Sequence, residues 1–438
     1  MNILYLNHYA GSPTLGMEYR PYYLAREWVR SGHQVHMVAA SFSHVRARQP
    51  EQGGQPLSAP LQQDIDGIRY HWFPAPPYQG NGLGRIRNIW AFLRQVWSNT
   101  DALIEQIRPD VVIASSTYPM DIWVARRIAR RAGAKLVFEV HDLWPLSPIE
   151  LSGMSRRHPF IMLVQKAEDD AYRDADIVIS MLPKVHDYMA SRGLDLRKLH
   201  IVPNGITLDE WSGSAPPLRE DVAAAIAQAR ASGAAVVGYA GSMGLPNALD
   251  TLLDAAAQLQ REPAGRAPLQ IVMVGSGHER DRLLHRIQAE GLTNVQLLAP
   301  IPKAQIPSFL AQIDIAYIGW QRVPIYRFGI APNKLMDYMM AGCAVLHSVE
   351  AGNDPVAEAR CGLTVPPESA EAVATGLRQL AALPAPERQA MGVRGRAFVE
   401  AEHTYPVLAR RFMEAVSPID ASHRPADRLK PSSRPAAR

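Results

Sequence analysis

The sequence of 438 residues has little of what marks secreted and membrane-spanning proteins. It holds only two cysteines, Cys343 and Cys361, and both lie in apolar stretches. Two cysteines do not make the disulfide framework of a secreted domain. No apolar run approaches the roughly 20 residues that cross a bilayer, and the start MNILYLNHYA lacks the features of a signal peptide. These absences predict a protein of the reducing cytoplasm.

Several catalytic and binding motifs are also missing. The sequence has no H-E-x-x-H, no cluster of cysteine and histidine, no G-x-S-x-G and no G-x-x-x-x-G-K. Their absence argues against a protein zinc site, an esterase-type nucleophile and a P-loop. The net charge of +4 is mild for nucleic-acid binding, so we expect no nucleic-acid partner, but it is compatible with docking on an anionic membrane.

The chain instead shows a regular alternation of apolar strands and amphipathic helices. With 47% hydrophobic and 20% charged residues it has the balance of a globular protein, and its length suggests two or three domains. Residues 46–63 are rich in Gln, Pro and Gly and predict a loop. The strands are expected at 2–7, 34–40, 68–74, 110–114, 135–140, 177–181 and 201–204, then at 234–240, 270–274, 295–298, 313–318, 344–346 and 363–365.

This order predicts an α/β protein of two doubly wound, Rossmann-like domains with a junction near residues 205–233. Parallel strands joined by crossover helices are the expected architecture. In such sheets ligands bind beyond the carboxyl ends of the strands, so two facing sheets would hold one ligand in the cleft between them.

Residues 84–97 combine arginines with Trp, Ile, Phe and Leu at helical spacing. A basic amphipathic helix of this kind could lie on an anionic membrane. The alternative, which we favour, is ordinary core packing beneath arginines that extend to solvent.

The stretch 326–348 carries the clearest ligand signal. Pro332 predicts the start of a helix, Gly342 predicts its end, and a short buried strand follows. A helix start favours an anion, and Lys334 adds a full positive charge there. Asp337 lies one turn further on the same face and could accept hydrogen bonds from sugar hydroxyls. The pair suits a nucleoside diphosphate; the alternative is a surface ion pair on a capped helix.

Four other places follow predicted strands. The loop at 8–16 holds Gly11 and Gly16 and could cradle a phosphate, although it lacks the G-x-G-x-x-G fingerprint. A tight turn is the alternative. His141 stands at the end of a buried strand, where it could act as a base or donate to a substrate, with Asp142 beside it; a structural histidine is the alternative. The others are Ser242 and Met243 in a glycine turn, and Pro300 and Ile301 in a loop that could face a flat base.

Taken in order, these segments resemble the retaining glycosyltransferases of family 4, which have the GT-B fold. The resemblance runs from Met1 to about Val416. It includes the 11–16 loop with LAREWVRSGHQV, VHD at 140–142, DADIVIS at 174–180, IVPNGI at 201–206, YAGSMG at 239–244, VGSGHERDRL at 274–283 and APNKLMDYMMAG at 331–342. The last segment is similar to the version in bacterial surface-polysaccharide enzymes, including those that resemble N-acetylfucosamine transferases.

The resemblance implies a nucleoside-diphosphate sugar as donor, with no cofactor and no metal. It implies that His141 contacts the donor sugar or stabilises the reacting centre, and that Asp337 binds the ribose. The expected diphosphate ligands are Gly16, Ser242, Met243, Asn333 and Lys334. Further candidates are Arg327, Asp142 and Gly11 for the sugar or phosphates, and Pro300 and Ile301 for the base.

Two departures from the family pattern concern the donor site. Many members carry two glutamates eight residues apart; here Asp337 replaces the second and Gly329 stands at the place of the first. The usual Arg and Lys after the first strand of the second domain are absent, so phosphate neutralisation is expected to fall on Lys334, with Arg327 as a candidate partner.

The prediction is therefore an enzyme of GT-B fold that transfers a sugar with retention to a lipid-linked or saccharide acceptor in lipopolysaccharide or exopolysaccharide biosynthesis. It is expected in the cytoplasm, and docking of residues 84–97 would give it a peripheral place on the inner membrane. The alternatives are a nucleotide-sugar epimerase of the same fold and a non-catalytic nucleotide-sugar-binding subunit. The domains are expected at 1–205 and 206–385, with helices at 386–416 crossing back to the first domain and a disordered tail at 417–438.

Overall fold

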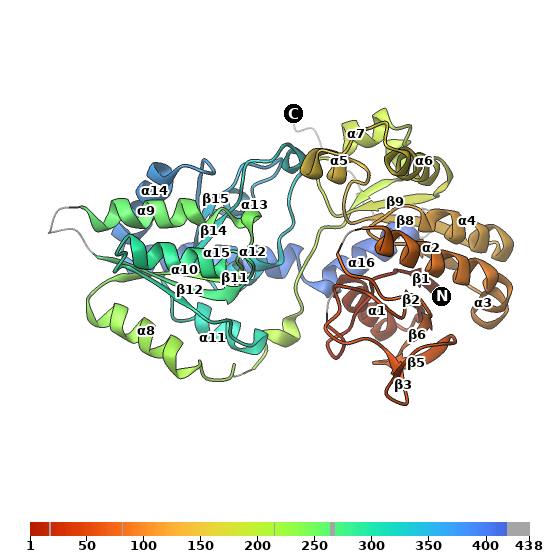
Figure 1. The fold of residues 1–438 in the computed structure, drawn as a ribbon, viewed down its shortest axis with the longest axis horizontal. Coiled ribbons are helices and arrows are strands. Elements are labelled where there is room, and N and C mark those ends of the chain that lie inside the picture. Colours follow the sequence, from red (N-terminus) through yellow and green to blue (C-terminus); the bar gives the residue numbers. More distant parts are fainter. Residues whose placement is uncertain (17–18, 81, 214, 263–267, 418–438) are drawn as a thin grey trace, which may run out of the picture.

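The computed structural model describes residues 1–16, 19–80, 82–213, 215–262 and 268–417. Two α/β domains lie side by side, joined by two crossings of the chain (Figure 1). Each domain is a parallel sheet with helices on both faces, so the predicted fold class is confirmed.

The first domain is built on an eight-stranded sheet with the order β10-β9-β8-β7-β1-β2-β6-β5. All neighbours pair in parallel except β5, which runs antiparallel to β6 at the edge. The central strands are continuous apolar runs because helices cover both faces. The strands are β1 (Asn2–Leu6), β2 (Gln34–Ala40), β5 (Leu61–Ile65), β6 (Ile68–Phe73), β7 (Val111–Ala114), β8 (Lys135–Val140), β9 (Ile177–Ser180) and β10 (Leu199–Ile201).

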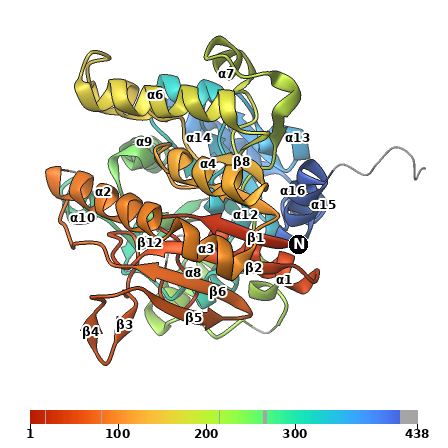
Figure 2. The ribbon, with the colours of Figure 1, turned by 90° about the vertical axis from the view of Figure 1, so that its right-hand side faces the viewer.

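Two hydrophobic layers fill the faces of this sheet. Phe92, Ile128 and Val164 belong to the layer beneath α2, α4 and α6, whereas Trp28 and Phe412 belong to the layer beneath α1 and α16. Figure 2 looks onto this domain and shows α2 and α4 on its outside. The helices are α1 (Arg20–Arg30), α2 (Leu83–Ser98), α3 (Thr100–Ile107), α4 (Asp121–Ala132), α5 (Leu146–Ser152), α6 (Pro159–Asp174) and α7 (His186–Ser191).

The second domain has a six-stranded parallel sheet in the order β13-β12-β11-β14-β15-β16. Its two apolar layers are likewise separate, one on each face. The strands are β11 (Ala235–Ser242), β12 (Leu269–Ser276), β13 (Val295–Leu298), β14 (Ile315–Gly319), β15 (Ala344–Ser348) and β16 (Gly362–Val365). The helices are α8 (Glu220–Ala231), α9 (Leu249–Gln260), α10 (Arg280–Ala289), α11 (Ile306–Leu310), α12 (Asn333–Met340), α13 (Pro355–Ala359) and α14 (Ala370–Ala382).

The two crossings between the domains run beside each other. The N–H of Ile206 donates to the carbonyl of His403 at 2.9 Å, and the N–H of Tyr405 donates to the carbonyl of Ile206 at 3.0 Å. A Cβ on Gly205 would lie 2.2 Å from the His403 carbonyl oxygen, so only glycine fits there. We call the two crossings, residues 202–206 and 403–405, the hinge.

The C-terminal helices divide at this hinge. Helix α15 (Ala385–Glu402) packs against α12, α13 and β15 of the second domain, and only α16 (Tyr405–Val416) packs against α1 and β9 of the first. The prediction had treated 386–416 as one crossing unit. The predicted tail lies outside the described residues from 418 onward.

The predicted loop at 46–63 was wrong in part. It contains a small antiparallel hairpin, β3 (Glu51–Gln52) with β4 (Gln55–Pro56), and it includes most of the edge strand β5. Strand β5 has the sequence LQQDI and is largely exposed, so it has no apolar face to signal a strand. Among the described residues, no helix has the length and apolarity needed to cross a bilayer.

Candidate donor and active site

Helix α12 places Lys334 against the turn after β11. Pro332 is the N-cap of the helix, and Gly342 ends it with a left-handed φ of 76°. The Lys334 ammonium donates to the Asn247 Oδ1 at 2.6 Å and to the Tyr239 hydroxyl at 3.0 Å. Burial lowers the pKa of Lys334 to about 8. The structure therefore places one cation at the strand end, as predicted from the sequence.

The turn after β11 needs a glycine at position 241. A Cβ on Gly241 would lie 3.2 Å from both Cε and Nζ of Lys334, so a side chain there would crowd the ammonium. Ser242 is exposed next to this position. Met243 differs from the prediction, because its N–H donates to the Ser276 carbonyl at 2.7 Å and its side chain is fully buried. Its backbone donor is therefore already used within the protein.

Asp337 lines a cavity of about 360 Å³ on the other side of α12. Glu210 and Lys303 line the same cavity and form an ion pair of 2.7 Å, and the Tyr23 hydroxyl donates to Glu210 at 2.7 Å. Burial raises the pKa of Asp337 to about 7. The alternative interpretation, a surface ion pair between Lys334 and Asp337, is not found, because Lys334 donates to Tyr239 and Asn247.

The predicted base loop lies next to this cavity. Arg219 donates to the carbonyl of Pro300 at 2.7 Å and to that of Ala299 at 3.2 Å. Ile301 packs on the apolar layer of the second domain. The part of this segment that lines the cavity begins at Lys303, two residues after Ile301, and ends at Pro307.

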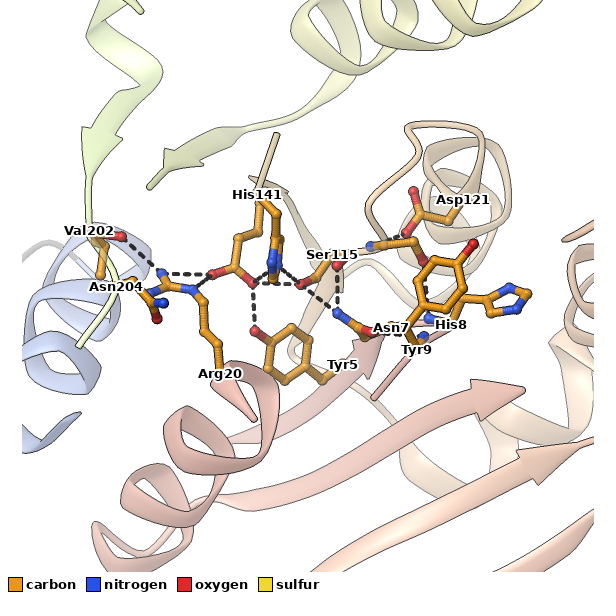
Figure 3. A network of polar contacts seen from close by, with 12 residues as sticks. Tyr5, Asn7, His8, Tyr9, Arg20, Ser115, Asp121, His141, Val202 and Asn204 are labelled. Carbon is orange, nitrogen blue, oxygen red and sulfur yellow. Dashed lines mark hydrogen bonds and ion pairs between the residues drawn. The ribbon is translucent and has the colours of Figure 1, made fainter. Parts of the chain in front are cut away.

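His141 lies at the end of β8 in a buried polar network (Figure 3). Its Nε2 is 2.8 Å from the Ser115 Oγ and 3.4 Å from the Glu139 Oε2. Burial alone raises the pKa of Glu139, but Arg20, His141 and Ser115 outweigh it and hold that pKa well below its usual range. The carboxylate therefore stays ionised behind the histidine.

The glycine loop after β1 is folded tightly on itself. The N–H of Gly16 donates to the Ser12 carbonyl at 2.8 Å, and the Gly11 carbonyl accepts from the Tyr70 hydroxyl at 2.8 Å. Gly16 has a φ of 94°, and a Cβ there would lie 2.9 Å from the Ala47 nitrogen. The predicted turn function of this glycine is thus evident in the fold, and its proposed contact with a diphosphate stays a prediction.

Arg327 takes a different place from the one predicted. Its guanidinium forms two hydrogen bonds of 2.7 Å with the carboxylate of Glu150 in the first domain. It thereby joins the domains instead of extending to the start of α12. Asp142 is exposed at the same boundary, where its charge adds to burial in raising the pKa of Tyr326.

The neighbouring Gly329 is the position at which many family members carry a glutamate. It has a φ of 102°, and a Cβ would lie 2.4 Å from the Pro183 Cδ of the first domain. Any side chain would therefore collide with the domain contact. A glutamate at position 329 is therefore incompatible with this packing.

The loops after β1, β2, β6 and β7 form a basic rim on the first domain. Segments 7–16, 41–50, 74–80 and 115–120 contain no Asp or Glu. Arg46 is 5% exposed, donates to the carbonyls of Ala10 and Ala40, and has no carboxylate partner among the described residues. Arg85 lies over the rings of Tyr9 and Trp144 at 5.5 and 5.7 Å. Arg85 and the rings of Tyr9 and Trp144 therefore lie together near the ends of these strands.

Sequence reasoning missed Glu139, Arg20 and Lys303. Glu139 had a usable signal, because it is a charged residue in an apolar strand and lies two residues before His141, on the same face of β8. Arg20 and Lys303 had none, since their partners come from segments far away in the sequence.

Comparison with known proteins agrees with this geometry. The model described as "Glycosyl transferase 4-like domain" matches residues 16–205, and the model described as "Glycosyl transferases group 1" matches residues 234–382. The chain is a glycosyltransferase of the group 1, family 4 type. Among curated proteins, this glycosyltransferase is 24% identical over 371 residues to WcaI of Escherichia coli (strain K12), which is named for colanic acid biosynthesis; the match covers 82% of this chain and 87% of WcaI.

Several solved structures share the fold of this glycosyltransferase. Sucrose-phosphate synthase from Thermosynechococcus elongatus matches with a TM-score of 0.69 at 19% identity, over 95% of this chain and 98% of that one. HepE from Anabaena, in complex with UDP, matches with a TM-score of 0.65 at 17% identity, over 96% of this chain and 100% of that one.

Proposed function

We propose that the enzyme transfers a sugar, with retention of configuration, from a nucleoside-diphosphate sugar to an acceptor in the assembly of a bacterial surface polysaccharide. The observation that carries the proposal is the pairing of Lys334 and Asp337 on α12, with the ammonium beside the Gly241 turn and the carboxylate in a cavity. A diphosphate fits the first and a ribose diol fits the second.

The donor is bound by the second domain in this proposal. Lys334 and Ser242 hold the diphosphate, with Asn333 at the helix start and Gly16 facing from the first domain. The 360 Å³ cavity takes the nucleoside, whose hydroxyls donate to Asp337. Uridine is the first base to test, because HepE was solved with UDP and with UDP-glucose. N-acetylfucosamine-type sugars are the first sugars to test. The proposal includes no metal.

The acceptor is bound by the first domain, on the basic rim. A lipid-linked acceptor carries phosphate next to its sugar, and both groups have matching surfaces there. Arg85 offers positive charge there, and the rings of Tyr9 and Trp144 offer apolar faces to a sugar. The absence of carboxylates from the four rim segments favours an anionic acceptor over a neutral saccharide.

A membrane surface is the proposed location of that acceptor. Helix α2 buries Ile89, Phe92 and Leu93 in the core, which is the packing we favoured from the sequence. Its outer side nevertheless exposes Trp90 and Trp97, which are 41% and 45% exposed. Arginines of α2 and α4 flank them, and Arg127 lies 4.6 Å from the Trp97 ring. Such a face suits the cytoplasmic side of an anionic inner membrane.

The test of donor binding is a thermal-shift screen of nucleoside diphosphates and their sugars on the wild type and on Lys334→Ala. A ligand at about 100 times its Kd stabilises the native state by about 2.7 kcal/mol. One base that raises the Tm of the wild type and not of Lys334→Ala supports the proposal. No shift with any nucleotide or nucleotide sugar would contradict the proposed donor site.

A further inference from the structure

Glu139 is fully buried and is the acceptor on which a whole polar network converges. Its Oε2 accepts from the Tyr5 hydroxyl at 2.5 Å and from the Ser115 Oγ at 2.6 Å, and it lies 3.4 Å from the His141 Nε2. Its Oε1 accepts from the Arg20 Nε at 3.0 Å. Arg20 and His141, which contact this carboxylate from two sides, are labelled in Figure 3.

Arg20 connects this carboxylate to the hinge. Its Nη1 donates to the Pro203 carbonyl at 2.6 Å, and its Nη2 donates to the Val202 carbonyl at 2.9 Å. Only 3% of Arg20 is exposed. One rigid guanidinium thus satisfies a carboxylate on one side and two hinge carbonyls on the other.

The hinge also contacts α12, the helix that carries Lys334. Asn204 directly follows these carbonyls, and its side chain donates to the Asn333 Oδ1 at the start of α12. The Tyr405 hydroxyl donates to Asn204 at 3.3 Å, and the His403 ring lies 3.0 Å from the Asn204 carbonyl. A continuous set of polar contacts therefore runs from His141 to the helix that carries Lys334.

We propose that Glu139 is a positioning residue for His141, and that Arg20 makes the orientation of His141 depend on the hinge and so on the arrangement of the two domains. The proposal rests on the role of His141 in the proposed transfer. A buried guanidinium fork has fixed geometry, so a movement of the Val202 and Pro203 carbonyls moves Arg20 and weakens its hydrogen bond to Glu139. A buried carboxylate that loses its cation must find another hydrogen-bond donor, and the His141 ring is the neighbour that responds.

Neither residue takes part in the chemistry in this scheme. Glu139 holds the His141 ring in one orientation through its contact with Nε2. Arg20 makes that contact depend on whether α12 stays bound to Asn204. The consequence is that the histidine is aligned only while the hinge holds α12 against the first domain. This limits donor breakdown when the site is incomplete.

The test measures the His141 ring directly, by NMR of protein labelled at its 14 histidines. The His141 signals are assigned by their loss in His141→Gln. Glu139→Gln keeps the shape of the side chain and removes its charge, and Arg20→Lys keeps the charge and removes the fork. Arg26→Lys is the matched control. Arg26 lies on the same helix as Arg20 and contacts Thr207 and Asp209, just after the hinge, but it does not contact Glu139.

We expect Glu139→Gln to shift the His141 ring nitrogens in the free protein. We expect Arg20→Lys to abolish the change in those signals that UDP produces in the wild type, and Arg26→Lys to retain that change. Unchanged His141 signals in Glu139→Gln, or an unchanged UDP response in Arg20→Lys, would overturn the inference. If Glu139→Gln does not fold, Ser115→Ala removes a contact shared by Glu139 and His141 and gives the same readout.

Kinetics separate positioning from a merely structural effect. Glu139→Gln and Arg20→Lys are each expected to lower kcat on the order of 10- to 100-fold, as small misplacements of reacting groups do. The donor KM should change less than threefold. Equal loss in kcat and in donor affinity would indicate general damage and overturn the inference. The NMR of the free protein needs no donor, so a failure of the proposed function leaves the Glu139 test standing.

Discussion

The charge of Lys334 makes a quantitative prediction about donor affinity at alkaline pH. Burial lowers the pKa of this lysine to about 8, far below its usual range, so the ammonium is lost as the pH rises through that value. Since the protonated form is the one that binds a diphosphate, the apparent Kd should increase with pH. A lysine of ordinary pKa would stay charged over this range and would leave the Kd constant.

The magnitude follows from the pKa alone. If only the protonated form binds, the apparent Kd rises about eightfold between pH 7.5 and pH 9.0, which is about 1.2 kcal/mol. The measurement is isothermal titration with a nucleotide sugar, whose phosphates carry no second ionisable proton. Lys334→Arg is the control, because a guanidinium remains charged over this range and should give a constant Kd.

Two results would refute the reasoning. A wild-type Kd that stays constant from pH 7.5 to 9.0 would show that Lys334 is not in contact with the phosphates, or that its pKa is ordinary. An equal rise in Lys334→Arg would assign the titration to another group.

Three further predictions concern the other groups of the site and the domain contact. Burial raises the pKa of Asp337 to about 7, so its carboxylate ionises only as the pH rises through 7. From pH 6 to pH 8 this lowers the Kd for a nucleotide sugar about tenfold, loss of the Lys334 charge raises it about twofold, and the wild-type Kd should therefore fall about fivefold. Asp337→Asn should lose this fall, and a retained fall would remove Asp337 from the site. Gly329→Ala should cost about 2 kcal/mol or more in urea unfolding, because it adds a clash with Pro183 to a left-handed backbone, whereas Gly153→Ala, with a φ of 65° and no described atom within 4 Å, should cost about 1 kcal/mol; equal losses would contradict the close packing. Arg327→Gln should break the bidentate contact with Glu150 and increase the radius of gyration in solution scattering, and an unchanged radius would show that this pair does not hold the domains together.

The fold was largely predictable because buried parallel strands read as plain apolar runs. The strands at 34–40, 135–140 and 295–298 have the predicted bounds. Strand β5 was missed because it is a polar edge strand. The break between α15 and α16 was also missed, although Pro406 in the first turn of α16 was a usable signal.

The site was predictable where its geometry is local. Lys334 and Asp337 lie on one helix, and their spacing alone placed them one turn apart. Met243 was expected at the diphosphate and Arg327 was a candidate for the sugar or the phosphates, but their partners, Ser276 and Glu150, come from another strand and from the other domain. The position of such partners depends on tertiary packing, which a single sequence does not reveal.

The most direct test of the proposed transfer is to follow a labelled sugar from its nucleotide donor into the lipid fraction of bacterial inner membranes. The account predicts that the wild type moves label into that fraction, that His141→Ala reduces the rate at least 100-fold while it still binds the donor, and that the new linkage has the anomeric configuration of the donor. Transfer at an undiminished rate by His141→Ala would contradict the role of His141, and inversion would contradict retention. Donor binding without any transfer to lipid or saccharide would contradict the central claim.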